Sequence, residues 1–147
     1  MKIYLASSWR NEEFPAVRDI LRKAGHEVYD FRDPPSKTAF KWSDIDPNYK
    51  EWGASEYVAA LKHPVAEGGF KSDMGAMEWA DVCVLLLPSG RSAHLEAGWF
   101  AGKGKPVFIL TRHGEEPELM AKMCTAVCWR MSTLLGLLDN QSGVSGL

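Results

Sequence analysis

Hydrophobic residues in this chain form short unbroken runs that alternate with segments of helical periodicity. The first run covers residues 3–6, and apolar residues then recur at helical spacing from Phe14 to Ala24. This pattern predicts a buried strand followed by an amphipathic helix. Gly25 would end that helix, and the alternation over residues 27–31 predicts a second strand. Together these segments make a β-α-β unit.

The middle of the chain combines turn-forming residues with further periodic segments. Residues 32–46 predict a long loop, after which Asp46 and Pro47 suit the cap and first position of a helix to about Lys62. A second helix is expected over residues 65–80. Residues 82–87 are six apolar residues in a row. Such a run, without alternation, is typical of a parallel strand that is covered on both faces.

The same alternation continues towards the C-terminus. The pattern predicts a helix over residues 93–102, a strand over 106–110, a short helix over 117–123, a strand over 125–129 and a helix over 132–138. This predicts the α/β class, with one domain over residues 1–139. Its expected architecture is a three-layer α/β/α sandwich on a five-stranded parallel sheet, most simply in the flavodoxin-like order 2-1-3-4-5. The Gly/Ser-containing residues 140–147 predict a flexible tail.

The composition fits one folded domain and excludes several classes of protein. The 147 residues are 46% hydrophobic and 24% charged, which is enough apolar material for a core. The net charge of -2 argues against a broad basic surface for nucleic acid. No apolar run approaches the roughly 20 residues of a membrane span. We therefore expect neither a nucleic-acid partner nor a membrane.

The cysteines and histidines form no recognisable framework. The three cysteines are odd in number and contain no C-x-x-C pair, so neither a disulfide scaffold nor a zinc site is indicated. The four histidines are scattered. We therefore expect no metal and no cofactor. An early apolar run too short for a signal peptide, together with this cysteine usage, predicts a cytoplasmic protein.

Two polar segments directly follow the first and third predicted strands. One contains Ser7, Ser8 and Arg10, and the other, residues 89–92, contains Gly90, Arg91 and Ser92. In the expected strand order the carboxyl ends of these two strands meet at the crevice where ligands bind. Hydroxyls, an arginine and a helix N-terminus are donors that suit a phosphate or carboxylate. Simple helix capping by Ser92 is the alternative, and neither segment is a P-loop or a G-x-G-x-x-G motif.

Two carboxylates are candidates for chemistry. Glu96 follows Ser92 by four residues in a mostly apolar helix, where an unused carboxylate would be costly. Its alternative role is a favourable interaction with the helix dipole. Asp73, by periodicity alone, fits a solvated surface acid. Asp81 is expected at the opposite, amino end of the sheet and is therefore interpreted as structural.

Several stretches resemble the nucleoside 2-deoxyribosyltransferase family and its relative, the 2'-deoxynucleoside 5'-phosphate N-hydrolase. They are residues 3–10, 73–81, 90–98 and 104–107, which span most of residues 1–111 in order. The resemblance implies cleavage of an N-glycosidic bond at C1' of a nucleoside or nucleotide. In this interpretation Glu96 is the nucleophile that forms a glycosyl-enzyme intermediate, resolved by another base or by water. Asp73 would assist departure of the base, and Tyr4 would orient Glu96.

The resemblance also bears on the substrate. Transferases of unphosphorylated deoxynucleosides usually have an aspartate six residues before the catalytic glutamate, where this chain has Gly90. The hydrolase-like branch binds a 5'-phosphate with serines, a glycine and an arginine, which Ser8, Arg10, Gly90 and Ser92 resemble. We therefore expect a nucleoside 5'-monophosphate, with Arg91 as an additional contact. A non-catalytic nucleotide-sensing module and an NAD glycohydrolase remain as alternatives.

The segment over residues 33–70 is long for such a fold and rich in aromatic residues. These are Phe40, Trp42, Tyr49, Trp52, Tyr57 and Phe70. They would either stack on a base or form a core or a dimer face. Since members of the family commonly form homo-oligomers, a homodimer or higher homo-oligomer is expected.

Overall fold

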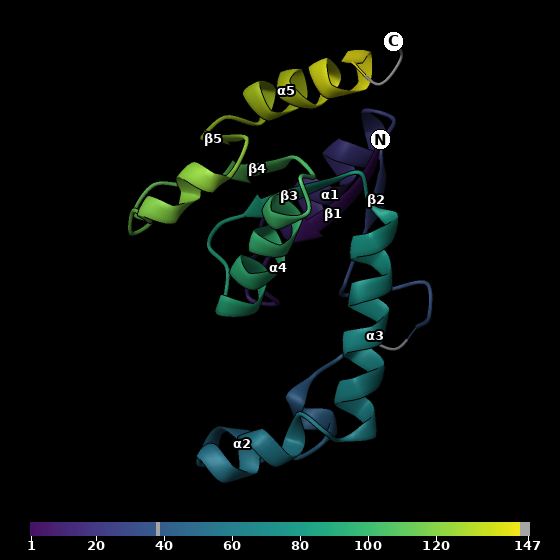
Figure 1. Cartoon of the computed structure of the whole chain (residues 1–147), viewed down its shortest axis with the longest axis vertical. Helices are drawn as coiled ribbons and strands as arrows, with labels where there is room; N and C mark the ends of the chain where they lie inside the picture. The colour runs from purple at the N-terminus through teal and green to yellow at the C-terminus, as the bar shows by residue number, and fades with distance from the viewer. Residues whose placement is uncertain (38, 145–147) are drawn as a thin grey trace. The chain divides into compact units, whose positions relative to one another are not determined.

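A five-stranded parallel sheet organises the computed structural model, which describes residues 1–37 and 39–144 (Figure 1). The strands are β1 (Lys2–Ala6), β2 (Glu27–Tyr29), β3 (Val82–Leu86), β4 (Val107–Leu110) and β5 (Ala126–Cys128). Their order is β2-β1-β3-β4-β5. The predicted α/β class and strand order are therefore confirmed. All five residues of β3 are buried, as expected for a strand covered on both faces.

Five α-helices accompany the sheet in the described part of the chain. They are α1 (Phe14–Lys23), α2 (Ala54–Ala60), α3 (Pro64–Trp79), α4 (Arg91–Gly102) and α5 (Met131–Val144). Helix α5 runs beyond the predicted end at residue 138. Of the expected tail, residues 140–144 thus continue α5, and residues 145–147 lie outside the described residues.

The predicted helix from Asp46 to Lys62 is wrong. The chain instead makes 3-10 turns at Trp42–Asp44 and Tyr49–Glu51, and only Ala54–Ala60 is α-helical. The Asp46 carboxylate accepts hydrogen bonds from the Asn48 amide at 2.9 Å and from Trp52 Nε1 at 2.8 Å. This local turn competes with the helix. The predicted helix over residues 117–123 is likewise a 3-10 helix, η3 (Leu119–Met123).

The chain divides into two compact units. The sheet unit comprises Met1–Asp30 and Trp79–Leu147, and the insert unit comprises Phe31–Glu78. In the sheet unit α4 packs on β1, β3 and β4, while α5 packs on β4 and β5. Figure 1 shows α4 and α5 on opposite sides of the sheet. This places the start of α4, directly after β3, at the carboxyl edge of the sheet.

None of the described helices is long and apolar enough to cross a membrane.

Candidate functional site

The centre of the candidate site is a hydrogen bond between Tyr4 on β1 and Glu96 on α4. The Tyr4 hydroxyl donates to Glu96 Oε2 across 92 positions of sequence. The Tyr4 ring is only 1% exposed. It stacks on Tyr29 with 5.4 Å between ring centroids and packs against Phe100 at 5.7 Å. Tyr4 is therefore held rigidly and constrains the half-buried Glu96 carboxylate.

The charge of Glu96 acts on the interior of the sheet. Cys83 on β3 is the strand partner of Tyr4 and is fully buried. Burial, and after it the negative charge of Glu96, raises the pKa of the Cys83 thiol well above its usual range. A thiol in these surroundings stays protonated and is a poor nucleophile. The nucleophilic candidate at this place is thus the carboxylate rather than the cysteine.

Two side chains tie the loop after β1 to the loop after β3. Ser7 Oγ donates to the Leu86 carbonyl at 2.9 Å, and Asn11 Nδ2 donates to the Pro88 carbonyl at 3.1 Å. Asn11 is buried, and its Oδ1 accepts a hydrogen bond from the Glu13 amide at 2.9 Å. Asn11 was not among the site residues predicted from the sequence. The sequence feature that could have identified it is an asparagine in the capping region just before α1.

The remaining residues of the predicted anion site lie around these two loops. Ser8 Oγ accepts a hydrogen bond from the Arg10 amide at 3.1 Å. Gly90 is the N-cap of α4, so Ser92 lies within the first turn and does not cap the helix. The side chains of Arg10, Arg91 and Ser92 are exposed. The carboxyl edge of the sheet therefore carries solvent-accessible donors beside a helix N-terminus, which is an arrangement that suits an anion.

Asp73 belongs to the insert unit, in the middle of α3. It is half-buried and lies on the helix face of Ala66, Gly69 and Met77, which are buried. Asp73 is therefore partly solvated rather than fully exposed. A carboxylate on a buried helix face is costly unless it has a role. Glu96, in contrast, belongs to the sheet unit.

Most aromatic residues of the insert unit pack on one another. Trp42 makes edge-to-face contacts with Phe40, Trp52 and Tyr57, at centroid distances of 4.8, 5.7 and 6.0 Å. Tyr49 packs on Trp52 at 6.2 Å. These residues form a partly buried aromatic cluster in a segment with little regular secondary structure. The sequence left open whether these residues stack on a base or pack in a core or dimer face. In the structure they pack on one another.

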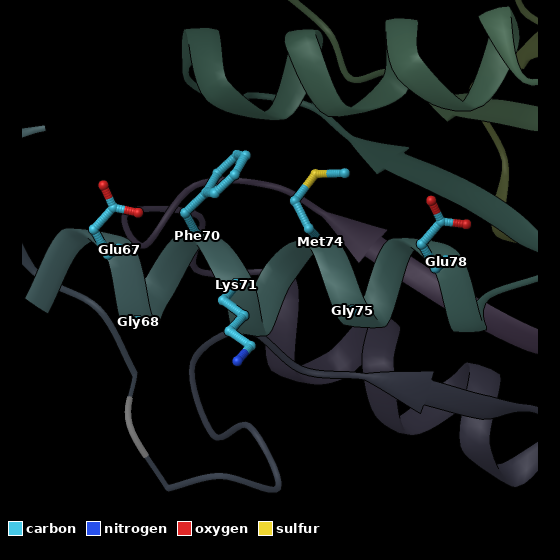
Figure 2. A pocket seen from close by; sticks show the side chains of 7 residues that line it. All are labelled: Glu67, Gly68, Phe70, Lys71, Met74, Gly75 and Glu78. Atoms are coloured by element: carbon cyan, nitrogen blue, oxygen red, sulfur yellow. The ribbon is translucent and has the colours of Figure 1, made fainter. Parts of the chain in front are cut away.

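Phe70 is 67% exposed, more than Tyr57 at 50%, the other exposed aromatic residue of this unit. It lines a hollow of about 680 Å³ along α3 together with Glu67, Gly68, Lys71, Met74, Gly75 and Glu78. Figure 2 shows Phe70 and Met74 side by side between Glu67 and Glu78, with Lys71 on the other side of the helix. All of these residues come from one helix, and neither Tyr4 nor Glu96 is among them.

The described residues contain no group of three or more His, Cys, Asp or Glu side chains that could hold a metal ion. The chemistry available at the sheet edge is therefore that of a carboxylate, its tyrosine partner and nearby anion-binding groups.

Comparison with known proteins identifies solved structures that share this fold. No protein-family model matches the chain, and no curated protein matches its sequence. A solved 2-deoxyribosyltransferase from the psychrotolerant bacterium Bacillus psychrosaccharolyticus is similar, with 24% identity and a TM-score of 0.63 over 92% of this chain and 90% of that one. The Clostridium botulinum CMP N-glycosidase BcmB is also similar, with 15% identity and a TM-score of 0.50 over 95% of this chain and 99% of that one.

A conserved protein from Enterococcus faecalis V583 is also similar, with 16% identity and a TM-score of 0.58 over 96% and 98% of the two chains. At these identities the similarity establishes a shared fold over nearly the whole length of each protein.

Proposed function

We propose, from the premise that the chain shares its fold with a 2-deoxyribosyltransferase and a CMP N-glycosidase, that it cleaves the N-glycosidic bond of a nucleoside or, preferentially, a nucleoside 5'-monophosphate. The observation that carries this proposal is the hydrogen bond from Tyr4 to Glu96. It holds a half-buried carboxylate at the carboxyl edge of the sheet, where ligands bind in open α/β folds. A carboxylate held in this way suits attack on an electron-poor sugar carbon.

In the proposed reaction one Glu96 oxygen attacks C1' of the sugar. The bond from C1' to the base nitrogen breaks, and its electron pair leaves with the base, which takes up a proton. The sugar is then held as an ester of Glu96. Water or a second base attacks C1' in turn and releases the carboxylate. Tyr4 holds Oε2 so that the carboxylate stays aligned with the oxocarbenium-like transition state.

Asp73 is the proposed second carboxylate, which donates the proton to the departing base or holds the sugar. Support comes from its half-buried position beside the buried residues of α3. Departure of a base from C1' needs a proton at or before the transition state. Removing Asp73 should therefore slow substrates with poor leaving groups more than those with good ones.

The proposed phosphate site consists of Ser7, Ser8, Arg10, Gly90, Arg91 and Ser92. Support comes from the Ser7–Leu86 and Asn11–Pro88 hydrogen bonds, which hold the two loops against each other. The Arg10 guanidinium and the amides of the first turn of α4 would then share one anion. This arrangement favours substrates that carry a 5'-phosphate over the corresponding nucleosides.

The test is to incubate the purified chain with deoxynucleosides, ribonucleosides, their 5'-monophosphates and NAD, and to follow free base by chromatography. We expect base release from at least one monophosphate, its loss in Glu96→Gln, and its retention in the control Glu67→Gln, an exposed glutamate. Full turnover by Glu96→Gln would contradict the proposal. Tight binding without base release would indicate a sensing module, and nicotinamide release from NAD would indicate a glycohydrolase of that dinucleotide.

Two additions resolve the mechanism. A second free base in the assay distinguishes transfer, which yields a new nucleoside or nucleotide, from hydrolysis. Rapid acid quenching followed by intact-mass measurement should detect a sugar adduct on the wild-type chain and none on Glu96→Gln. An adduct of equal yield on Glu96→Gln would exclude Glu96 as the nucleophile.

A further inference from the structure

A continuous series of hydrogen bonds runs along the carboxyl edge of the sheet unit. Asn11 Nδ2 donates to the Pro88 carbonyl, and Asn11 Oδ1 accepts from the Glu13 amide. The Glu13 carboxylate accepts from Arg112 Nε at 2.7 Å, 99 positions away in sequence. Arg112 Nη1 in turn donates to the Trp129 carbonyl at 3.4 Å. We call these five residues the edge network.

The edge network joins the ends of four strands. Asn11 and Glu13 lie in the loop after β1, and Pro88, Arg112 and Trp129 follow β3, β4 and β5. The Thr111 amide donates to the Cys128 carbonyl at 2.9 Å, so β4 and β5 stay paired up to Arg112. The loop after β1 is therefore anchored twice, to the loop after β3 through Asn11 and to the ends of β4 and β5 through Glu13.

The two anchors differ in burial. Asn11 is 3% exposed, so its bonds are part of the folded interior. In the outer ion pair the side-chain exposure is 53% for Glu13 and 28% for Arg112. Ion pairs of this exposure contribute little to the stability of a whole fold. The expected effect of the Glu13–Arg112 pair is thus local, on the position of the loop that it holds.

We propose that Glu13 and Arg112 are positioning residues for the phosphate site, which hold the loop after β1 in its binding conformation. This inference rests on the proposed function, in which that loop contributes Ser7, Ser8 and Arg10. A loop that is already ordered loses little conformational freedom when its ligand binds, so less of the interaction free energy is offset. Loss of the pair should therefore weaken the binding of a 5'-phosphate.

The reacting end of the site is held by other contacts. Glu96 lies on α4 and is held by Tyr4 on β1, and neither residue belongs to the edge network. A variant of Glu13 or Arg112 should therefore raise KM for a 5'-monophosphate and leave kcat unchanged. A nucleoside without the phosphate does not use the loop, so its KM should not change.

The sign of the Glu13 effect distinguishes positioning from direct electrostatics. Glu13 carries a negative charge in the same loop as Arg10. If charge alone mattered, Glu13→Gln would tighten the binding of an anion. Positioning predicts the opposite, because Glu13→Gln removes the acceptor that ties the loop to Arg112.

The experiment measures dissociation constants by isothermal titration calorimetry for nucleosides, their 5'-monophosphates and inorganic phosphate, in a Glu96→Gln background that prevents turnover. We expect Glu13→Gln and Arg112→Gln each to raise the constant for a monophosphate about 5-fold, the factor for one partly exposed ion pair. The double variant should match either single variant, because both break one interaction. Steady-state kinetics with Glu96 intact measure KM and kcat separately.

Two matched controls change the same charges elsewhere. Glu12→Gln removes the charge of the neighbouring exposed glutamate. Arg22→Gln removes an arginine of α1 whose Nη2 donates to the Val28 carbonyl at 2.9 Å. We expect neither control to weaken monophosphate binding. Circular dichroism verifies that each variant is folded, and Arg112→Lys, which keeps the charge, should bind more tightly than Arg112→Gln.

A second readout needs no ligand. Amide hydrogen exchange over residues 7–13 should be faster in Glu13→Gln and Arg112→Gln than in the wild type, because the loop opens more often. Unchanged exchange in both variants would overturn the inference. So would monophosphate binding that the two variants leave unchanged or tighten, or an equal weakening of nucleoside binding. A wild type that binds no phosphate-bearing probe would overturn the proposed phosphate site itself, and this inference with it.

Discussion

Two adjacent glycines of α3 provide a sharp test of the packing inside the insert unit. A Cβ at Gly69 would lie 2.7 Å from Phe40 Cβ and 3.0 Å from Phe40 Cγ, whereas a Cβ at Gly68 meets nothing within 4 Å. Carbon atoms pack best at about 3.5–4.0 Å, so Phe40 would have to retreat. Its edge-to-face contact with Trp42, at 4.8 Å, opposes that movement. Gly69→Ala therefore overpacks the aromatic cluster.

The expected change in the free energy of unfolding is the result of two opposing effects. Alanine in place of glycine favours a helix by about 1 kcal/mol at either position. Overpacking at Gly69 costs about 1–3 kcal/mol. We expect Gly68→Ala to raise the free energy of unfolding by up to about 1 kcal/mol, and Gly69→Ala to lie below Gly68→Ala by about 1–3 kcal/mol.

The assay is urea unfolding followed by tryptophan fluorescence and far-UV circular dichroism. Trp42 and Trp52 lie in the affected aromatic cluster and contribute to the signal of the six tryptophans. Comparison of the two variants removes the shared effect of helix propensity. Equal stability of Gly68→Ala and Gly69→Ala would refute the inference that Phe40 is pressed against α3 at Gly69.

Three further predictions concern residues of the sheet unit, and the control for the third, Asp33→Ala, lies in the insert unit. Tyr4→Phe should lower kcat/KM of the proposed reaction about 10- to 100-fold, because a hydrogen bond to a carboxylate contributes about 1.5–3 kcal/mol. Steady-state kinetics measure this effect. An unchanged kcat/KM would contradict a positioning role for Tyr4. Folding raises the pKa of the Cys83 thiol above its usual 9.0. The stabilisation by the protonated thiol is therefore complete below pH 9.0 and declines as the pH rises further. Between pH 8 and pH 10 the free energy of unfolding should fall less in Cys83→Ala than in the wild type, as measured by denaturation at both pH values. Asp30→Ala should lower the free energy of unfolding by about 2–3 kcal/mol, because it removes the buried carboxylate that pairs with Arg18 Nη1 at 2.7 Å. Asp33→Ala removes only the exposed ion pair with Lys37. In the same denaturation assay it should lower the free energy of unfolding by less than about 0.5 kcal/mol.

The sequence alone was sufficient for the fold class and for most elements of the sheet unit. The unbroken run over residues 82–87 identified a buried parallel strand, and the structure has β3 at Val82–Leu86. The apolar spacing from Phe14 likewise identified α1. These predictions succeeded because strand and helix patterns record which positions face a core, and that information is local.

Prediction failed where a side chain made its own local contact and was incomplete where a helix face was ambiguous. The Asp46–Trp52 hydrogen bond replaces the expected helix, and a cap-like Asp-Pro pair does not reveal it. Asp73 fitted a surface acid by periodicity, and it is half-buried beside the buried Ala66 and Met77 of α3. The role of the aromatic residues was open until Trp42 was found in contact with three of them.

The sequence by itself determined an α/β sheet in the order 2-1-3-4-5 and nominated Tyr4 and Glu96 through a family resemblance. Only the tertiary structure decided that their side chains meet, since 92 positions separate them and the parallel register of β1 and β3 brings α4 over Tyr4. It also revealed Asn11 as a link between the two loops and Arg112 as the partner of Glu13. Such pairings depend on how distant segments pack, which the pattern of burial along one segment does not encode.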